Sequence, residues 1–585
     1  MKKAFLTLIS LIVLSGGTTS CAQKAEKDKF IVRKIDNYLN ENISNGFSGA
    51  VLIAKQGKII LNKGYGLANR EDDILYSPNT VATIGSTTKQ FTATAILKLV
   101  EFNNIKVTDP LSTFFTDLPN DKKNITIHQL LTHTSGLIDV IGKGDFDYIP
   151  REQFFKTLFE TELIQKPGLK YRYSNAGYSI LARIIELVSG QEYERFLNEY
   201  LFKPAGMKQT GYFIPDWDKK MIASGYMNTI IPVGTMIERF HKAGNKVSWT
   251  LKGNGGIHST PEDMYKWYLA LKSNTILSKS LTKTLTTPYT PEQESGSSHY
   301  AYGWAIFNSD RNTKMVSHNG GNRIFFHDFI WLPKEDVVII FFTNATSREV
   351  ELAWPIEKMI FNADYQPKPI KKNLNFFILD FIKKNKINKS NVLTTMIKKE
   401  YSSDLRNGDA LNDTGYMILR QEENPDWAIE LFSLNVQLFS DNGNLWDSLG
   451  DGYKKKGDKE KAIKAYQKAY KLDPSLTASI NSLAEFGIKV EVKAKKEVVV
   501  DHSILKSYTG KYELKPGFVL TVMYKNGKLI VRPTGRDTMP MFAESNEKFF
   551  LEKINANIRF NKNDDGKVES LTLIESGEEM LANRL

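Results

Sequence analysis

The chain has 585 residues, of which 41% are hydrophobic, 25% are charged and one is a cysteine. This composition is that of a globular protein with sizeable cores, so it excludes a disordered chain. The lone cysteine excludes an internal disulfide and a cysteine-based metal site. The length predicts several domains, because single cores stop growing at roughly 250–300 residues. The formal net charge is +12, but the lysines are spread without a dense basic block, which favours solvated faces and argues against nucleic acid as a partner.

The first 22 residues have the layout of a secretory signal peptide. Met1-Lys2-Lys3 precedes an apolar run from Ala4 to Leu14, and small residues then lead to Cys21. We therefore expect residues 1–22 to direct export, and we find no later segment long and apolar enough to span a membrane. Cys21 resembles the lipid-modified cysteine of bacterial lipoproteins, and ordinary cleavage after Ala22 is the alternative. The mature protein is expected in the periplasm, free or lipid-anchored to a bacterial membrane.

Residues 23–365 have the pattern of one domain built on an antiparallel sheet. Apolar residues at helical spacing and a strand pair around a glycine turn come first, and a second strand pair with a following helix comes last. This arrangement predicts that both ends of the domain pair in one sheet, with largely helical material inserted between them. The expected hairpins cover residues 49–63 and 323–343, with helices at 29–45 and 349–361.

The next segment, residues 366–497, is expected to be helical. It begins with the linker Gln366-Pro367-Lys368-Pro369, and its best-defined stretch has the residue spacing of a tetratricopeptide helix pair after a degenerate first repeat. We favour a structural spacer, and a groove that binds a protein partner is the alternative. The signature positions are Trp446, Leu449, Gly450, Tyr453, Ala462, Tyr466, Ala469 and Pro474.

Residues 498–585 are expected to form a small all-β barrel or meander. Apolar and polar residues alternate from about Asp501 onward. The dipeptides Asn526-Gly527 and Asp565-Gly566 are typical of tight hairpin turns. This last region contains no recognisable catalytic grouping.

One of four Ser-x-x-Lys steps in the chain is a candidate catalytic pair. In Ser86-Thr87-Thr88-Lys89 the serine precedes apolar residues at helical spacing, which places Ser86 at the start of a helix and Lys89 on its first turn. Residues three apart on a helix lie about 5–6 Å apart at Cβ, so the hydroxyl and the amine can share a proton. A plain helix cap is the competing interpretation of Ser86. The other steps are Ser280/Lys283, Ser503/Lys506 and Ser545/Lys548.

Further motifs in a fixed order favour catalysis over capping. Gly85-Ser86-Thr87-Thr88-Lys89 is followed by Leu130 to Leu137 (LLTHTSGL), by Tyr173-Ser174-Asn175, and by His318-Asn319-Gly320, the single His-x-Gly of the chain. Together they resemble the β-lactamase-like, penicillin-recognising serine hydrolases: class C β-lactamases, D-alanyl-D-alanine carboxypeptidases, penicillin-binding proteins and related esterases. The resemblance covers roughly residues 30–364 and implies a β-lactamase-like fold. The stretch from Tyr508 to Tyr512 likewise resembles β-modules appended to such hydrolases.

The resemblance implies a role for each matching residue. Ser86 would attack the carbonyl, and Lys89 with Tyr173 would pass its proton to the leaving group, giving an acyl-enzyme. Asn175 would hold the substrate amide and orient Lys89. The backbone N–H groups of Ser86 and Gly321 would form the oxyanion hole beside Gly320.

His318 departs from the family's commonest pattern. β-lactamases carry lysine at this position in a Lys-Thr-Gly triplet, and no such triplet exists in this chain. A fixed ammonium binds a substrate carboxylate, whereas histidine is only partly charged near neutrality. His318 is still expected to contact substrate, but efficient β-lactamase activity is less favoured than hydrolysis of other substrates.

Two other motifs are assigned structural roles. The resemblance makes His133 part of a structural turn outside the site, and Gly253-Asn254-Gly255-Gly256 a glycine-rich turn near the wall of the site. The histidines lack the spacing of metal ligands, so we expect no metal, and we expect no cofactor.

The sequence therefore predicts a multidomain α/β protein that is an exported serine hydrolase. Its expected substrates are small esters, amides or D-amino-acid peptides. Two alternatives stay open. One is a β-lactamase proper, and the other is a non-catalytic penicillin-binding-like sensor or scaffold whose helical repeats bind a partner.

Overall fold

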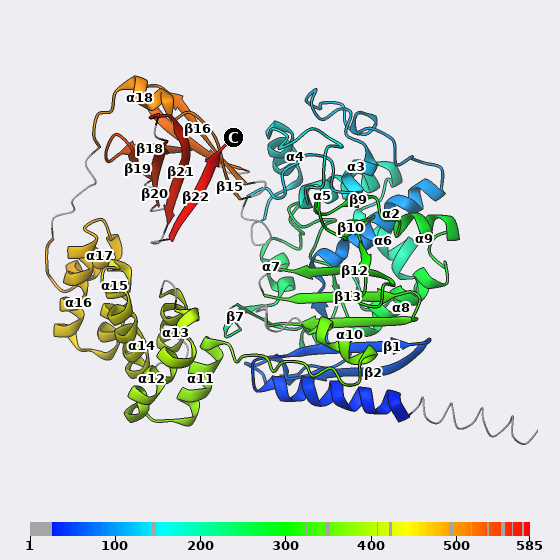
Figure 1. Cartoon of the computed structure of the whole chain (residues 1–585), viewed down its shortest axis with the longest axis horizontal. Helices are drawn as coiled ribbons and strands as arrows, with labels where there is room; N and C mark the ends of the chain where they lie inside the picture. The colour runs from blue at the N-terminus through cyan, green and yellow to red at the C-terminus, as the bar shows by residue number, and fades with distance from the viewer. Residues whose placement is uncertain are drawn as a thin grey trace, which may run out of the picture. The chain divides into compact units, whose positions relative to one another are not determined.

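The structure is a computed structural model in which the chain forms two compact units, Met1–Lys372 and Asn373–Leu585 (Figure 1). The expected signal peptide and Cys21 lie outside the residues it describes. No helix among the described residues is long and apolar enough to cross a membrane. The described residues are 26–142, 148–227, 229–322, 324–345, 352–405, 408–420, 424–490, 497–515, 518–534, 538–551, 556–563, 565–575 and 578–585.

The first unit is built on an eight-stranded antiparallel sheet with the order β2-β1-β14-β13-β12-β11-β10-β9. β1 pairs with β14, so that Gly49 lies opposite Thr343 and Lys55 opposite Val337. The prediction that both ends of this domain pair in one sheet is therefore confirmed. The strands are β1 (Gly49–Lys55), β2 (Lys58–Tyr65), β9 (Thr290–Pro291), β10 (His299–Tyr300), β11 (Ala305–Asn308), β12 (Lys314–Gly321), β13 (Phe326–Leu332) and β14 (Val337–Thr343).

Side chains alternate along the central strands and separate two apolar layers. Val51 and Ile53 pack with the helix of residues 26–43 and with α10 (Ala353–Phe361) on one face. Leu52 and Ala54 face the larger layer on the other side. That layer contains α2 (Thr88–Glu101), α3 (Ile127–Leu131), α4 (Arg151–Glu160), α5 (Asn175–Ser189), α6 (Tyr193–Leu197), α7 (Met236–Lys242), α8 (Pro261–Lys272) and α9 (Lys279–Leu285).

Short strand pairs lie outside the eight-stranded sheet. β5 (Ala82–Thr83) pairs with β8 (His258–Ser259) and leads directly into the turn that carries Ser86. The other two pairs are β3 (Leu67–Asn69) with β4 (Ile74–Leu75), and β6 (Gly225–Met227) with β7 (Ile231–Gly234).

The His-x-Gly triplet lies at the end of a strand that the sequence analysis did not identify. His318 precedes the last hairpin, as its position in the sequence implies, and residues 314–321 form the additional strand β12, which pairs with β13 from Val316 to Gly321. β11 pairs with β12 only as far as Ser317. The last four residues of β12 therefore have a strand on one side only, and the other side faces the Ser86 turn.

The helical part of the second unit contains the predicted tetratricopeptide pair as α15 and α16. A Cβ added to Gly450 on α15 would lie 2.5 Å from the Tyr466 ring on α16, which explains why both signature positions are needed. The helices are α11 (Leu374–Lys384), α12 (Ser390–Glu400), α13 (Asp409–Arg420), α14 (Pro425–Leu438), α15 (Gly443–Lys456), α16 (Lys459–Leu472) and α17 (Thr477–Glu485).

The chain ends in a closed antiparallel barrel with an apolar interior, which confirms the predicted all-β region. Asn526 and Gly527 both have positive φ, of 51° and 83°, as the two-residue hairpin turn requires. A short helix, α18 (His502–Ser507), precedes the barrel and was not expected. The strands are β15 (Gly510–Lys515), β16 (Phe518–Lys525), β17 (Lys528–Pro533), β18 (Met539–Ala543), β19 (Lys548–Leu551), β20 (Ala556–Lys562), β21 (Val568–Glu575) and β22 (Glu578–Arg584).

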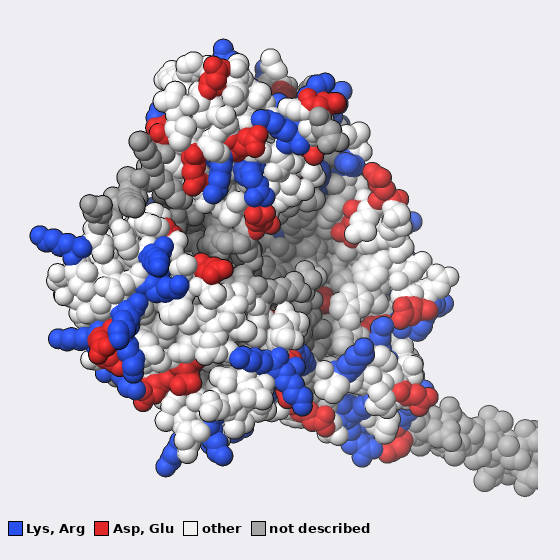
Figure 2. Space-filling view, turned by 60° about the vertical axis from the view of Figure 1, so that its left-hand side comes forward, with Lys and Arg blue, Asp and Glu red and all other residues white. Residues whose placement is uncertain are grey.

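Basic and acidic side chains are interspersed on the face drawn in Figure 2. Ion pairs among the described residues include Lys454 with Glu485 and Arg559 with Glu579. This arrangement fits the solvated charged faces expected from the sequence.

Candidate active site

Ser86 lies in a single 3-10 turn, Gly85–Thr87, that runs straight into α2. The side chain of Lys89 is completely buried on the first turn of α2, and Ser86 is half-buried. In the other three Ser-x-x-Lys steps the serine is exposed to solvent. Their lysines are exposed or only partly buried, so only the Ser86 step has its lysine enclosed in a core.

The ammonium of Lys89 is anchored from two directions. Its Nζ atom donates to Asn175 Oδ1 at 2.7 Å and to the backbone carbonyl of Asn254 at 2.8 Å. The same atom lies 4.8 Å from the centre of the Tyr173 ring, within cation–π range. The structure thus brings together Lys89, Tyr173 and Asn175, as the motif order predicts, and adds the glycine-rich turn as a direct contact.

The ring of His133 packs against the ring of Tyr173. The two ring centres are 4.2 Å apart, and His133 Nδ1 accepts a hydrogen bond from the backbone N–H of Ser174 at 3.0 Å. Burial, reinforced by the nearby charge of Lys89, holds the pKa of His133 well below its usual value. His133 is therefore a neutral packing residue and not a base, which agrees with its assignment to a structural turn.

Asn175 is fixed by an aspartate that the sequence analysis did not single out. Asp139 Oδ1 accepts from the Asn175 backbone N–H at 3.0 Å and from Asn175 Nδ2 at 2.9 Å. The Asn175 amide therefore has its nitrogen toward Asp139 and its oxygen toward Lys89.

Glycines bring the end of β12 against the nucleophile turn. A Cβ added to Gly320 would lie 2.1 Å from the carbonyl oxygen of Ile84 and 2.5 Å from the backbone nitrogen of Ser86. A Cβ added to Gly85 would lie 2.8 Å from the backbone nitrogen of Gly321. Real Cβ atoms do not approach so closely, so this contact requires glycine on both sides. The contact puts the backbone N–H groups of Ser86 and Gly321 on adjoining segments.

Hydrogen bonds fix the tautomer of His318. Its Nδ1 atom lies 2.6 Å from the carbonyl oxygen of Asn319, which can only accept, so Nδ1 carries the proton. Nε2 then accepts from the hydroxyl of Tyr300 at 2.9 Å. Burial, together with the charge of Lys89, lowers the pKa of His318 to about 3. His318 is therefore neutral at physiological pH, and both of its ring nitrogens have a protein partner.

A third buried histidine, His327, connects β13 to the nucleophile turn. The hydroxyl of Thr87 lies 2.9 Å from His327 Nδ1, and burial lowers the pKa of His327 to about 3. Asp139, Tyr300 and His327 had no signal in the sequence, because each acts through a contact between segments that no local motif encodes.

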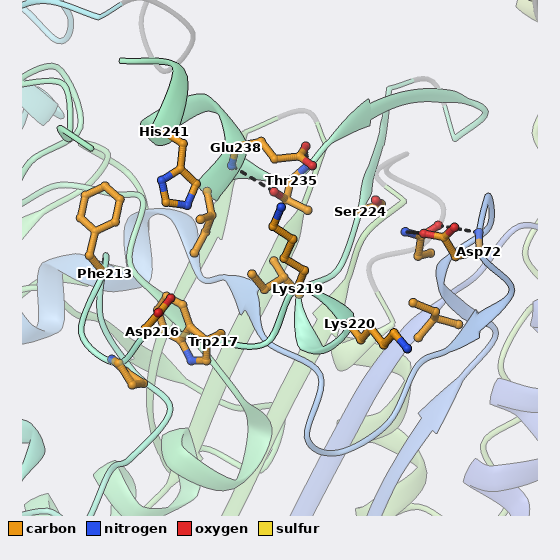
Figure 3. Close-up of a pocket in the computed structure, with 15 residues that line it drawn as sticks. Asp72, Phe213, Asp216, Trp217, Lys219, Lys220, Ser224, Thr235, Glu238 and His241 are labelled. Carbon is orange, nitrogen blue, oxygen red and sulfur yellow. Dashed lines mark hydrogen bonds between the residues drawn. The ribbon is translucent and has the colours of Figure 1, made fainter. Parts of the chain in front are cut away.

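A separate pocket of about 250 Å³ lies elsewhere in the first unit (Figure 3). Trp217, Phe213 and His241 contribute rings to its lining, and Lys219 and Lys220 enter it together with acidic residues. Ser86, Lys89 and Tyr173 are not among its lining residues. Among the residues that the structure describes, no cluster of His, Cys, Asp and Glu could hold a metal ion.

Three family profiles match parts of this chain. The family profile described as Beta-lactamase matches residues 33–357, a tetratricopeptide repeat profile matches residues 443–476, and a domain of unknown function, DUF3471, matches residues 494–582.

Two bacterial relatives illustrate the similarity. The chain is 34% identical over 279 residues to a candidate penicillin-binding protein, PbpX, of Bacillus subtilis (strain 168), which covers 47% of this chain and 65% of that protein. It is 28% identical over 334 residues to Protein flp of Staphylococcus aureus (strain MW2), covering 54% and 64%. The chain thus spans slightly less than two thirds of the length of either relative. Among solved structures, a penicillin-binding protein from Bacillus halodurans aligns with 27% identity and a TM-score of 0.47, over 55% of this chain and 96% of that one.

Proposed function

Because this chain belongs to the Beta-lactamase family, we propose that it is an exported serine hydrolase that forms an acyl-enzyme on Ser86. The resemblance of its motifs to those of penicillin-binding proteins and related esterases implies this route. The substrates we propose are small esters, amides or D-amino-acid peptides. A β-lactamase proper is the less favoured alternative.

The proposed reaction uses the residues around Lys89. The Ser86 oxygen attacks the substrate carbonyl, while its proton passes to Lys89 or Tyr173, one of which must be deprotonated at the start. The backbone N–H groups of Ser86 and Gly321 hold the oxyanion, and the same proton then goes to the leaving group as the carbonyl re-forms. Water repeats these steps on the acyl-enzyme, which releases the acid and restores Ser86.

The observation that carries this proposal is the environment of Lys89. The side chain of Lys89 is fully buried one helical turn after Ser86. Its ammonium donates a hydrogen bond to Asn175 Oδ1 at 2.7 Å and lies 4.8 Å from the centre of the Tyr173 ring. A non-catalytic scaffold has no physical need for a fully buried amine three residues after a half-buried serine. This arrangement supports acyl transfer over a non-catalytic sensor.

The state of His318 supports uncharged substrates over β-lactams. A buried, neutral ring whose nitrogens are both occupied supplies no positive charge for a carboxylate. Substrates whose carboxylate would need a positive charge at the position of His318 are therefore disfavoured.

Covalent labelling tests the proposal. A fluorophosphonate probe should add one label to the folded wild-type protein, and Ser86→Ala should abolish both labelling and ester hydrolysis. Ser280→Ala is the matched control, since Ser280 begins another Ser-x-x-Lys step on an exposed helix and should leave labelling unchanged. Labelling that persists in Ser86→Ala would contradict the mechanism.

For the helical repeats we propose a spacer role. Asp451 on α15 accepts from the hydroxyls of Tyr416 and Tyr466 at 2.9 and 2.7 Å, and Asp447 accepts from Ser479 at 2.5 Å. Burial raises the pKa of the Asp447 carboxyl to about 6. These polar groups of α15 are engaged by neighbouring helices, which leaves fewer of them for a peptide. A pull-down whose partner is lost on mutating exposed residues of α16 would overturn the spacer in favour of a partner.

Our proposal of export and lipid attachment rests only on the sequence of the expected signal peptide and Cys21. The mass of the mature N-terminus distinguishes a diacylglyceryl group on Cys21 from cleavage after Ala22. A cytosolic, uncleaved protein would contradict both.

A further inference from the structure

We infer that Asp139 is a positioning residue that holds Lys89 in its reactive place by fixing the side-chain amide of Asn175. The inference rests on the proposed acyl transfer at Ser86. Three contacts carry it in series: Asp139 Oδ1 accepts from Asn175 Nδ2 at 2.9 Å, Asn175 Oδ1 accepts from Lys89 Nζ at 2.7 Å, and Lys89 lies one turn from Ser86.

The chemistry of an amide makes this series directional. The oxygen of Asn175 accepts hydrogen bonds and its nitrogen donates them, whereas Lys89 can only donate and an ionised carboxylate can only accept. If the amide rotates by 180°, its N–H groups face an ammonium and its oxygen faces a carboxylate, and both contacts become repulsive. Asp139 therefore selects the one orientation in which Asn175 accepts from Lys89.

The backbone places Asp139 where it can do this. The hydroxyl of Ser174 donates to the Ile138 carbonyl at 2.7 Å, and the Ala176 N–H donates to the Asp139 carbonyl at 2.9 Å. The segment is thus docked across the start of α5, and Asn175 is the first residue of that helix. The amide nitrogen of Asn175 has two protons, so one can bond Asp139 while the other is free for the substrate.

The solvent exposure of Asp139 allows its role to be tested by mutation. Its side chain is exposed to solvent, so removing it leaves no cavity in the core. A loss of function in a variant at this position would therefore not be explained by loss of the fold.

Two substitutions test the inference. In Asp139→Ala the rate at which Ser86 is phosphonylated by a fluorophosphonate, or acylated by an activated ester, should fall about 10- to 100-fold, within the range known for displaced catalytic groups. In Asp139→Asn, whose side-chain oxygen can still accept from Asn175, most of the rate should remain. Asp109→Ala is the matched control, because Asp109 also accepts from a backbone N–H, that of Lys106 at 2.7 Å. It should acylate like the wild type.

The outcomes separate this inference from the proposed function. If wild type acylates and Asp139→Ala matches it, or if Asp139→Asn is as slow as Asp139→Ala, positioning through the hydrogen bond is overturned. If no probe labels wild type, the proposed function fails instead. NMR of protein labelled with 15N-asparagine then still tests the contact. The Asn175 side-chain protons should exchange slowly in wild type and rapidly in Asp139→Ala, and equal rates would overturn the inference.

Discussion

The backbone of Gly320 lies so close to Ser86 that a Cβ added to Gly320 would be 2.5 Å from the Ser86 nitrogen. This contact joins the last residues of β12 to the turn before α2. It explains in steric terms why the third position of the His-x-Gly triplet is glycine. It also means that the two segments proposed to hold the oxyanion are positioned by each other.

Gly320→Ala should therefore abolish most acyl transfer. The new methyl group also meets the carbonyl oxygen of Ile84 at 2.1 Å, so one of the two backbones must move. A shift of about 1 Å at a reacting centre can cost roughly 100-fold in rate, and we expect at least that loss of Ser86 acylation. Gly296→Ala is the control, because the nearest atom to its Cβ is a side-chain carbon at 3.3 Å. Wild-type rates in Gly320→Ala would contradict the contact.

His318→Lys should change which substrates are preferred. Wild type has a neutral ring here, so an ester with a carboxylate on the group facing β12 should react no faster than its uncharged analogue. Lysine adds a cation, and one charge-assisted hydrogen bond should raise the relative kcat/KM for the carboxylate ester about tenfold. The matched ester pair measures this ratio directly. A wild-type preference for the carboxylate would mean that another cation serves the site.

Tyr300→Phe removes the hydroxyl that bonds His318 Nε2. The variant leaves a buried acceptor unsatisfied, which should cost about 1–3 kcal/mol and lower Tm. Tyr302→Phe is the matched control, because the Tyr302 hydroxyl also bonds a histidine, His128, whose Nδ1 atom lies 2.7 Å away. Both variants should lose stability, but only Tyr300→Phe should slow acylation of Ser86. Equal acylation rates in the two variants would show that Tyr300 supports only the fold.

Asp451→Ala tests whether the helical repeats and the hydrolase fold separately. The substitution removes the acceptor of two tyrosine hydroxyls, those of Tyr416 and Tyr466, and should destabilise the helical region by about 1–3 kcal/mol. Calorimetry should show one transition shifted to lower temperature, with ester hydrolysis at 25 °C unchanged. A fall in hydrolysis parallel to the shift would show that the repeats support the catalytic unit.

The parts of the molecule that local patterns encode were predictable from the sequence. The strand pair around Gln56-Gly57, the hairpin at Asn526-Gly527 and the tetratricopeptide pair each depend on residues a few positions apart. The pairing of β1 with β14 followed from the symmetry of those patterns. The start of α2 at the Ser86 turn followed from apolar spacing, and motif order then distinguished Ser86 from three equivalent serines.

The rest of the site depends on contacts that spacing cannot encode. Asp139 is one of 66 acidic residues, and only the docking of its loop on α5 brings it to Asn175. From the sequence we expected His318 to be partly charged near neutrality, because the burial and the nearby charge of Lys89 that lower its pKa are visible only in the fold. β12 was missed because its residues Ser317 to Gly321 are small or polar and lack the apolar alternation of a strand.

The buried histidines predict that the hydrolase unit is destabilised by acid. Burial lowers the pKa of His258, His318 and His327 to about 3, whereas an unfolded histidine titrates near 6.5. Between these values the unfolded chain binds more protons at these three sites, so their contribution to stability is constant above about pH 6.5 and falls as the pH drops toward 3. Each histidine contributes a slope of about 1.4 kcal/mol per pH unit.

His258→Gln measures how much of this pH dependence of stability comes from one histidine, and it leaves the acyl-transfer residues unchanged. Glutamine does not titrate, so Tm should fall less steeply between pH 6.5 and pH 4.5 than in wild type, even if the variant is less stable at pH 7. Exposed His241 gives the control, and His241→Gln should keep the wild-type slope. The pKa shifts of the three histidines have the same direction, so their effects add. The Tm of the wild type should therefore fall more steeply with decreasing pH in this window than one buried histidine could cause. A Tm that is flat from pH 7 to pH 4.5 would show that these histidines are protonated in the folded protein.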